Sequence, residues 1–366
     1  MHTTPDITFV GGGITGLLCA RLFAQSGAKV TIVDKNKIGQ ESSWAGGGIL
    51  LPLYPWRQVE AISQLVIPSI KVYPELDQKL KEATDIDPEY IVSGLLMNSL
   101  HDLDQAYAWC KKYDIQVSTV NEQQRLLFPH IENEALFLPK IAQARNPRLL
   151  KSLKQDLLQR GVRIIENCAI EKVTIKDQRI TEIMSQSEKI PVNQLVISSG
   201  AWSGNLWKQL LVNRESASIN VFPVKGQMVI FDAPKDTLKT MILENDRYLI
   251  PRKDGKILCG STVEQKEFDK STSEQAKKSL SDFAHKVFPV LKNTPVIHHW
   301  AGLRPGTESG VPYIDLHPEI ENLAVNAGHF RNGFAMGPAS AQLLYDLINK
   351  QTPQVDPTPY QLSAQH

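Results

Sequence analysis

The feature that most constrains the fold is a glycine-rich turn close to the start of the chain. A short apolar strand at residues 6–10 leads directly into Gly11-Gly12-Gly13-Ile14-Thr15-Gly16, and the apolar residues after the turn continue as a helix. In such a unit Gly11 forms the tight turn, Gly13 lets the backbone approach a pyrophosphate, and Gly16 lets the helix pack against the strand. The free N–H groups at the helix N-terminus attract the anion. The pattern therefore predicts a dinucleotide-binding turn.

The next strand supplies the second half of this signal. Residues 29–33 form an apolar strand that ends at Asp34, where a carboxylate can accept hydrogen bonds from a ribose. A glycine-rich turn without this context is weak evidence, because ordinary βα turns also contain glycine. The full pattern favours a dinucleotide, but it does not distinguish FAD from NAD.

Composition excludes several other classes of function. The chain has 40 Lys and Arg against 39 Asp and Glu, so it has no electrostatic signature for nucleic acid or an anionic membrane. Its four cysteines are far apart, which argues against a zinc site and a redox dithiol; they are Cys19, Cys110, Cys168 and Cys259. We expect no signal peptide at residues 1–5, no membrane span and no metal, and a cytoplasmic location.

The loop at residues 40–48 contains three adjacent glycines, which let a large ligand lie against the backbone. A flexible surface loop is the alternative, but Trp44 and the apolar residues 49–51 would need burial. Residues 57–115 are predicted to be mostly helical, with a helix start at 102–104. Another helix is predicted to begin with Asn146 as its N-cap and Pro147 in its first turn.

The pattern of predicted elements changes after residue 218. Strands with short turns and one helix near 273–288 indicate a mostly antiparallel sheet; the strands are 221–224, 227–231, 248–251 and 256–260. An apolar strand at 195–198 and a final strand, loop and helix over 322–349 belong instead with the nucleotide-binding sheet. Residues 351–366 are expected to be an irregular surface segment. The predicted fold is therefore α/β: a Rossmann-like nucleotide-binding domain (1–85, 141–218 and 306–366) interleaved with a mostly antiparallel substrate domain (86–140 and 219–305).

Six segments, taken together and in order, resemble the D-amino-acid-oxidase-type FAD flavoenzymes. They are the opening turn, Ser42-Ser43 with Gly46-Gly47-Gly48, Ser199-Gly200-Ala201-Trp202-Ser203, Tyr248-Leu249-Ile250-Pro251-Arg252, Gly302-Leu303-Arg304-Pro305 and Gly328-His329-Phe330-Arg331-Asn332-Gly333. Within this family the set is most similar to the bacterial glycine oxidases, which supply an imine for the thiazole of thiamine.

The resemblance implies noncovalent FAD between the two domains. No cysteine follows Cys259, which argues against a covalent flavin bond. The implied contacts are Gly11, Gly13, Ile14, Thr15 and Gly16 at the pyrophosphate, Asp34 and Lys35 at the ribose, Val173 at the adenine, Ser42, Ser43, Gly47, Gly48, Ile49 and Gly200 along the cofactor, and Gly328, His329, Phe330, Arg331, Asn332, Gly333, Phe334 and Ala335 along the flavin ring. The last helix would direct its N-terminus at the electron-rich end of the ring.

The resemblance also assigns three residues to the substrate. Arg304 matches a carboxylate anchor, since a guanidinium binds a carboxylate through two parallel hydrogen bonds; a structural arginine in a turn is the alternative. Tyr248 matches a tyrosine whose hydroxyl supports the same carboxylate. The alternative is a sheet tyrosine whose hydroxyl is exposed to solvent. Arg331 either pairs with substrate or braces its loop.

Histidines and pocket walls complete the set of candidates. His298 and His299 are expected to be strand residues facing solvent rather than bases, and His329 a structural residue of the flavin loop. Val263 and Ile49 are candidate walls that would favour a small side chain, or none, on the substrate.

The implied reaction converts glycine, oxygen and water into glyoxylate, ammonia and hydrogen peroxide by hydride transfer to FAD. Sarcosine and small D-amino acids are secondary substrates, a thiazole synthase is an expected partner for the imine, and the oligomeric state is open, with a homo-oligomer as one option. Three alternatives remain: an FAD-dependent dehydrogenase for D-amino acids or secondary amines that passes electrons to a quinone, a noncatalytic flavin-binding subunit, and an NAD-dependent dehydrogenase.

Overall fold

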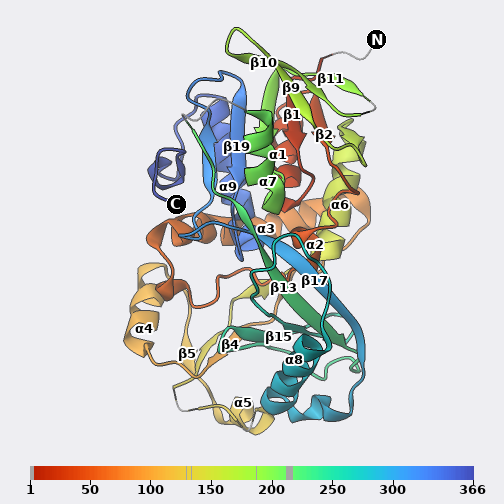
Figure 1. Ribbon diagram of the computed structural model, residues 1–366. Helices are drawn as coiled ribbons and strands as arrows, with labels where there is room; N and C mark the ends of the chain where they lie inside the picture. Colours follow the sequence, from red (N-terminus) through yellow and green to blue (C-terminus); the bar gives the residue numbers. More distant parts are fainter. Residues whose placement is uncertain (1–3, 129, 133, 187, 212–216) are drawn as a thin grey trace.

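The computed structural model describes residues 4–128, 130–132, 134–186, 188–211 and 217–366 (Figure 1). The first three residues, part of the stretch where no signal peptide is expected, lie outside this range, as do residues 212–216 near one predicted domain boundary. Two sheets form the centres of an upper and a lower half of the molecule, and the long strands β13 and β17 run between them. In the described part of the chain, no helix is long and apolar enough to span a bilayer.

The upper half is built on a six-stranded sheet with the order β18-β19-β12-β1-β2-β8. Five strands are parallel and β18 pairs antiparallel at one edge; the strands are β1 (Ile7–Val10), β2 (Val30–Val33), β8 (Arg163–Ile165), β12 (Gln194–Ile197), β18 (Tyr313–Leu316) and β19 (Leu323–Ala327). All residues of β1, β2 and β19 are buried, as parallel strands covered on both faces require. The predicted place of the 195–198 strand in this sheet is confirmed.

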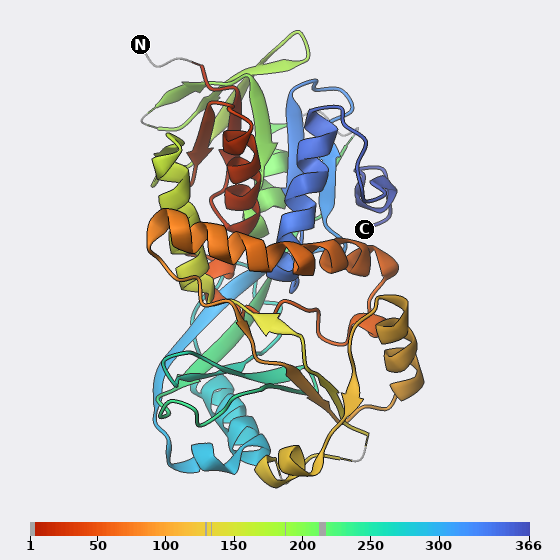
Figure 2. The ribbon, with the colours of Figure 1, turned by 180° about the vertical axis from the view of Figure 1, so that it is seen from behind.

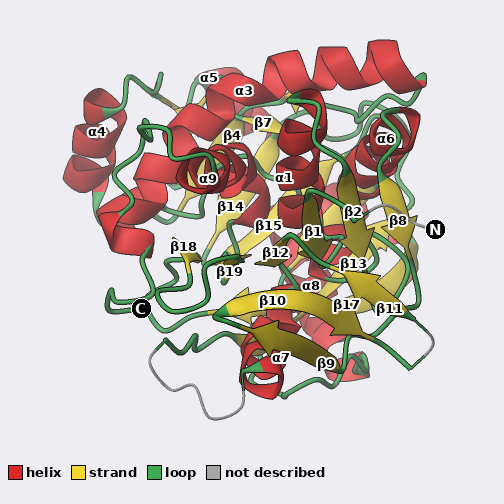
Figure 3. Ribbon diagram, turned by 90° about the horizontal axis from the view of Figure 1, so that it is seen from above, coloured by secondary structure: helices red, strands yellow, loops and turns green. Residues whose placement is uncertain are grey.

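Helices and a small sheet cover the two faces of this upper sheet (Figure 3). One face carries α1 (Ile14–Gln25), α6 (Asn146–Gln159) and α9 (Gly333–Ile348), with α3 (Glu60–Thr84) crossing beneath α1 and α9 (Figure 2). The other face carries α7 (Ser203–Leu210) and the antiparallel sheet of β9 (Lys172–Lys176), β10 (Arg179–Met184) and β11 (Lys189–Pro191).

The lower half is an eight-stranded sheet with the order β17-β13-β16-β15-β14-β4-β6-β5. Its strands are β4 (Leu95–Asn98), β5 (Ser118–Thr119), β6 (Leu136–Leu138), β13 (Phe222–Phe231), β14 (Met241–Glu244), β15 (Arg247–Pro251), β16 (Ile257–Gly260) and β17 (Val296–Gly306). Every neighbouring pair is antiparallel except β4 with β14. The predicted mostly antiparallel sheet is therefore confirmed, whereas the bounds of the five predicted domain segments stay predictions.

The remaining elements connect these two sheets or cover the lower one. They are α2 (Ser42–Ala45), α4 (Leu103–Lys112), α5 (Glu122–Leu127), α8 (Glu274–Val287), the paired strands β3 (Ile91–Val92) and β7 (Ala142–Gln143), and 3-10 turns at Pro55–Arg57, Gly200–Trp202, Pro289–Asn293 and Thr358–Tyr360.

Four local predictions are corrected. The range 57–115 is mostly helical and a helix starts at Leu103, as predicted, but β3 and β4 interrupt the range, because Leu95–Asn98 is buried in the lower sheet. The separate strands predicted at 221–224 and 227–231 form the single strand β13. The helix cap lies one residue earlier than predicted, at Arg145, and Asn146 instead donates its amide to the Ser43 carbonyl over 2.7 Å.

The fourth correction concerns the chain end, where the prediction of an irregular surface segment holds except at Tyr360. Tyr360 is fully buried, and its hydroxyl donates to the Ala61 carbonyl over 2.7 Å. The segment is short of regular structure but is fixed against the start of α3.

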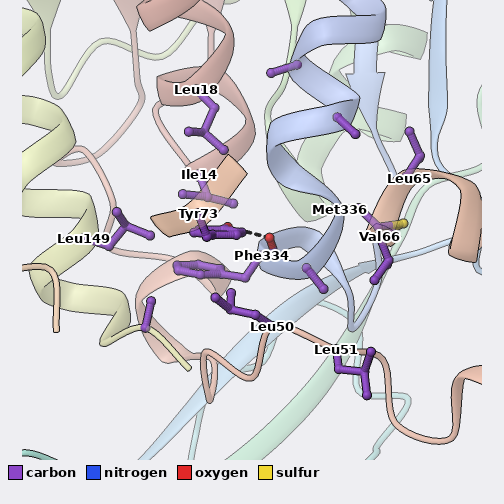
Figure 4. Packing of buried hydrophobic residues seen from close by; sticks show 14 of the residues in the cluster. Ile14, Leu18, Leu50, Leu51, Leu65, Val66, Tyr73, Leu149, Phe334 and Met336 are labelled. Carbon is purple, nitrogen blue, oxygen red and sulfur yellow. Dashed lines mark hydrogen bonds between the residues drawn. The ribbon is translucent and has the colours of Figure 1, made fainter. Parts of the chain in front are cut away.

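The largest core cluster joins α1, α3, α6 and α9 (Figure 4). The Tyr73 hydroxyl of α3 donates to the Phe334 carbonyl in the first turn of α9 over 2.5 Å, among apolar side chains that include Ile14, Leu50 and Leu149. Because Ile14 and Phe334 each stand in the first turn of their helix, this packing brings the N-termini of α1 and α9 close together.

Candidate active site

A cavity of about 350 Å³ lies where the two sheets meet. On the upper side it is lined by the β1–α1 turn, the loop around residues 39–49, the end of β12 and the segment 326–334; on the lower side it is lined by residues of β13, β15 and β17. Ligands of open α/β sheets bind outside the carboxyl ends of parallel strands, which is the position of this cavity.

The β1–α1 turn provides the first wall. Gly11 has φ +116°, and a Cβ at this position would lie 2.3 Å from the Ser198 carbonyl oxygen of the neighbouring strand end. A Cβ on Gly16 would lie 2.0 Å from the Gly11 carbonyl oxygen, so Gly16 serves packing and does not line the cavity. Gly13, Ile14 and Thr15 do line it, as predicted. The turn is therefore an open cradle that only glycine allows.

Two predicted ribose residues lie beside this turn. The Asp34 carboxylate accepts from the N–H of Gly12 over 2.7 Å and of Asn36 over 2.8 Å, and burial raises its pKa. The Lys35 ammonium stands 3.2 Å from the centroid of the Trp202 ring. Asp34, Lys35 and Trp202 all line the cavity.

Helix α2 and the loop after it form the middle of the cavity. Ser42, Ser43, Gly47, Gly48 and Ile49 line it, and Ser43 Oγ accepts from the Ile14 N–H over 2.9 Å. Among the described residues, nothing accepts a hydrogen bond from the N–H groups of Gly48 and Ile49. A ligand with acceptor atoms is needed to satisfy these groups.

Asn146 is a lining residue that the sequence analysis identified only as a helix start. Its Oδ1 is buried and has no partner within the described residues. An orphaned acceptor, free backbone donors and a glycine cradle together fit an elongated polar cofactor such as FAD.

The segment 326–334 completes the upper wall and ends at the N-terminus of α9. Gly328, Phe330, Asn332, Gly333 and Phe334 line the cavity, whereas Ala335 does not. No side chain caps α9, so its first N–H groups are available to an anionic ring.

His329 lies in the same segment but is buried and structural. Its Nε2 is 2.7 Å from Ser340 Oγ, which donates to Asn326 Oδ1 over 2.8 Å. Burial lowers the pKa of His329 to about 3. The imidazole is therefore neutral at ordinary pH and held in a network, as predicted, and it is not a base.

Arg304 brings a positive charge into the lower side of the cavity. Its guanidinium donates to Ser261 Oγ over 2.7 Å and to the Thr262 carbonyl over 3.2 Å, and it crosses Gly226, whose Cβ would lie 2.2 Å from Nη2. Within the described residues no carboxylate lies within ion-pair distance of it. Burial lowers its pKa to about 10, so it stays charged at neutral pH. An anion is the ligand that this site lacks.

Tyr248 lies beside Arg304 in the cavity wall. The side chain is buried, and its hydroxyl has Met228 Sδ at 3.9 Å as a weak acceptor. The hydroxyl can therefore donate to a better acceptor placed near Arg304.

Arg331 lines the cavity, but its side chain reaches the β14–β15 turn. Its Nη2 donates to the Asp246 carbonyl over 3.2 Å. Of the two roles considered, this contact favours bracing the loop.

Several predicted positions lie outside the cavity. Val263 is 53% exposed and does not line the cavity, so the prediction of a wall there is wrong; its neighbours Thr262 and Glu264 donate their N–H groups to β13. Val173 pairs with Ile183 in the small sheet and does not line the cavity, whereas Cys168, Ala169 and Ile170 just before it do. Gly200 lines it.

Neither histidine of β17 reaches the cavity either. His298 is exposed and stacks on Trp300 with ring centroids 5.3 Å apart, and His299 is partly buried.

Comparisons with known proteins agree on one family. The model of the FAD dependent oxidoreductase family, DAO, matches residues 6–347. Glycine oxidase of Pseudomonas putida is 40% identical over 361 residues, covering 97% of each chain. A bifunctional protein ThiO/ThiG of Synechocystis is 28% identical over 375 residues, which are 100% of this chain and 54% of that one. The crystal structure of glycine oxidase from Geobacillus kaustophilus superposes with a TM-score of 0.91 at 25% identity, covering 99% of both chains.

Proposed function

Because this chain belongs to the FAD-dependent oxidoreductase family and is an FAD-dependent amine oxidase, we propose that it oxidises glycine and other small amines, including sarcosine and small D-amino acids. The name of the P. putida relative and its 40% identity support glycine as the first substrate to test. The observation that carries the proposal is the unpaired Arg304 guanidinium in the cavity.

Arg304 and Tyr248 bind the substrate carboxylate. A guanidinium forms two parallel hydrogen bonds with a carboxylate, and the Tyr248 hydroxyl adds a third donor. Gly226 leaves room for the guanidinium, and Met228 and Ile49 line the same cavity with apolar side chains. These walls favour a substrate with a small side chain or none.

The β1–α1 turn, the 42–49 loop and the segment 328–334 would hold FAD, which when bound would supply the acceptance of a hydride from the carbon beside the amine. The protein fixes that carbon by holding the carboxylate, and the buried walls exclude water. His329 is neutral and already bonded to Ser340, so it removes no proton. With oxygen as the electron acceptor, the overall reaction would convert glycine, oxygen and water into glyoxylate, ammonia and hydrogen peroxide.

The imine also suggests a partner. The relative named bifunctional protein ThiO/ThiG has two parts in one chain according to its name, and the alignment with the present chain covers 54% of its length. This supports a thiazole synthase that consumes the imine before water does. A homo-oligomer and a cytoplasmic location stay predictions.

The test is the variant Arg304→Ala with glycine as substrate. Losing one partner of a buried charge pair costs about 2–5 kcal/mol, so we expect KM to rise at least roughly thirtyfold. Arg247→Ala is the matched control, because Arg247 contacts Ser279 and does not line the cavity. An unchanged KM in Arg304→Ala contradicts the assignment.

A panel of small amines then identifies the substrate and the electron acceptor together. Glycine should release peroxide and consume oxygen in equal amounts. Reduction of FAD by glycine without oxygen uptake would instead indicate a dehydrogenase that uses a quinone.

A further inference from the structure

Arg252, at the end of β15, is a buried arginine that the proposed chemistry leaves without a role. It is 7% exposed and does not line the cavity. Its Nη2 donates to the Gly47 carbonyl over 2.7 Å, and its Nη1 donates to Gln143 Oε1 over 2.8 Å. Its side chain therefore joins the lower sheet to the loop that forms the middle of the cavity.

The bond to Gly47 determines how the loop presents its donors. In a trans peptide the carbonyl and the following N–H point in opposite directions. The Gly47 carbonyl faces Arg252, so the Gly48 N–H faces away from it. In the same way the Gly48 carbonyl accepts from the Ala144 N–H over 2.9 Å, which turns the Ile49 N–H away from β7.

Both N–H groups belong to residues that line the cavity, and neither has an acceptor among the described residues. Glycine is required at position 48, because its φ is +76° and a Cβ would lie 2.0 Å from the Ala144 carbonyl oxygen. Arg252 and Ala144 thus bind the carbonyls of Gly47 and Gly48, so that two successive N–H donors of cavity-lining residues point away from them and stay free for a ligand.

The charge of Arg252 is also unusual. In the part of the chain that the structure describes, no carboxylate pairs with it, whereas the nearby Arg145 pairs with Glu89 and Asp254. Holding an unpaired guanidinium away from water is costly. A fixed positive charge behind two N–H donors is an arrangement that stabilises negative charge developing on a bound group.

We propose that Arg252 is a positioning residue for FAD: it directs the N–H groups of Gly48 and Ile49 at the flavin ring, and its positive charge favours the reduced, negatively charged flavin. The proposal needs FAD in the cavity but does not depend on which amine is oxidised.

The experiment compares Arg252→Lys and Arg252→Gln with the wild-type holoenzyme, without any amine present. The flavin midpoint potential is measured against reference dyes, and the FAD dissociation constant by recovery of flavin fluorescence. Arg252→Lys keeps the charge but loses the guanidinium group whose two nitrogens donate to Gly47 and Gln143. Arg252→Gln removes the charge. Arg145→Gln is the matched control, since it removes a neighbouring charge that does not touch the loop.

We expect Arg252→Gln to lower the ratio of reduced to oxidised flavin at a fixed potential about tenfold, which corresponds to about 30 mV for a two-electron couple. Arg252→Lys should retain the wild-type potential but bind FAD about tenfold more weakly. Arg145→Gln should change neither quantity.

Unchanged potential and unchanged FAD affinity in both Arg252 variants would overturn the proposal. An equal fall in potential in Arg145→Gln would also overturn it, because the loss of any nearby positive charge would then explain the effect. If Arg252→Gln does not fold, the FAD affinity of Arg252→Lys decides alone, and a wild-type value refutes the positioning role. Because no amine is used, these outcomes are independent of the Arg304 test.

Discussion

At the scale of single residues, burial decides what each titratable side chain can do. Arg304 and Arg252 stay protonated at neutral pH although burial lowers the pKa of each to about 10, because an arginine starts from a very high value. The ordinary pKa of a histidine is close to neutral pH, so the same effect of burial leaves the His329 imidazole uncharged. The site therefore contains fixed cations and a fixed neutral imidazole, which suits a reaction that binds an anion and needs no protein base.

The His329 imidazole predicts a component of acid sensitivity. Its folded pKa of about 3 is below the ordinary value of 6.5, so the unfolded chain binds the extra proton between these values. Stability is therefore lost as the pH falls through this window, by about 1.4 kcal/mol per unit and about 2 kcal/mol at pH 5. Urea unfolding of wild type and His329→Gln at pH 7 and pH 5 measures this component.

The control is His298→Gln, since His298 is exposed on β17. We expect this variant to keep the pH dependence of the wild type, whereas His329→Gln should lose the component assigned to the buried ring. Equal pH dependence in wild type and His329→Gln would show that the network tolerates the proton.

At the scale of elements, close approach of backbones makes the β1–α1 unit a cradle. The turn after β1 touches the end of β12, and α1 packs on the turn through Gly16. The strand end, the turn and the helix N-terminus are held together by contacts that leave no room for a Cβ. Apart from the Ile14 N–H, which donates to Ser43, the donors at the start of the helix are available to a pyrophosphate.

Gly11→Ala should break this unit, and Gly27→Ala is its control. Both glycines have positive φ, +116° and +89°, but a Cβ on Gly27 meets nothing within 4 Å. Gly27→Ala should cost about 1–2 kcal/mol for the backbone conformation alone. Gly11→Ala should cost more and should lose bound flavin, as measured by unfolding and visible absorbance. A wild-type flavin content in Gly11→Ala would contradict the proposal that this turn holds the cofactor.

At the scale of the whole molecule, the segment 261–273 of the lower half reaches across to the upper half. Phe268 stacks on Trp202 with centroids 5.4 Å apart, and Lys270 pairs with Glu41 over 3.1 Å. Trp202 and Glu41 line the cavity. The two halves thus hold the cavity wall together through contacts between residues distant in sequence.

Phe268→Ala should therefore weaken the retention of FAD. An aromatic pair contributes about 0.5–1.5 kcal/mol, so the rate of FAD release should rise roughly two- to tenfold. Release is followed by flavin fluorescence after dilution. Phe268→Tyr preserves the stack and should behave as wild type, and an unchanged rate in Phe268→Ala would show that the segment does not secure the cofactor.

Local patterns were sufficient to predict the strands β1, β2, β12 and β19 of the upper sheet and several residues that line the cavity. The turn at 11–16, Asp34 and the strand at 195–198 are each recognisable from short-range spacing, because a glycine-rich turn between strand and helix has one common use. The strands within 57–115 were missed, because Leu95–Asn98 reads equally well as a buried helix segment when its pairing with β14 is unknown.

The sequence by itself determined the dinucleotide turn, since this pattern depends on residues close together in the chain. Six short segments in order determined the family resemblance, which made Arg304 a candidate carboxylate anchor. Only the tertiary structure decided that Val263 is exposed to solvent and that Arg304 has no carboxylate partner among the described residues. It also decided that Asn146 Oδ1 is unpaired at the cavity and that Arg252 donates to the Gly47 carbonyl. The physical reason is that burial and pairing depend on neighbours brought from distant parts of the chain, and spacing along the sequence contains no record of them.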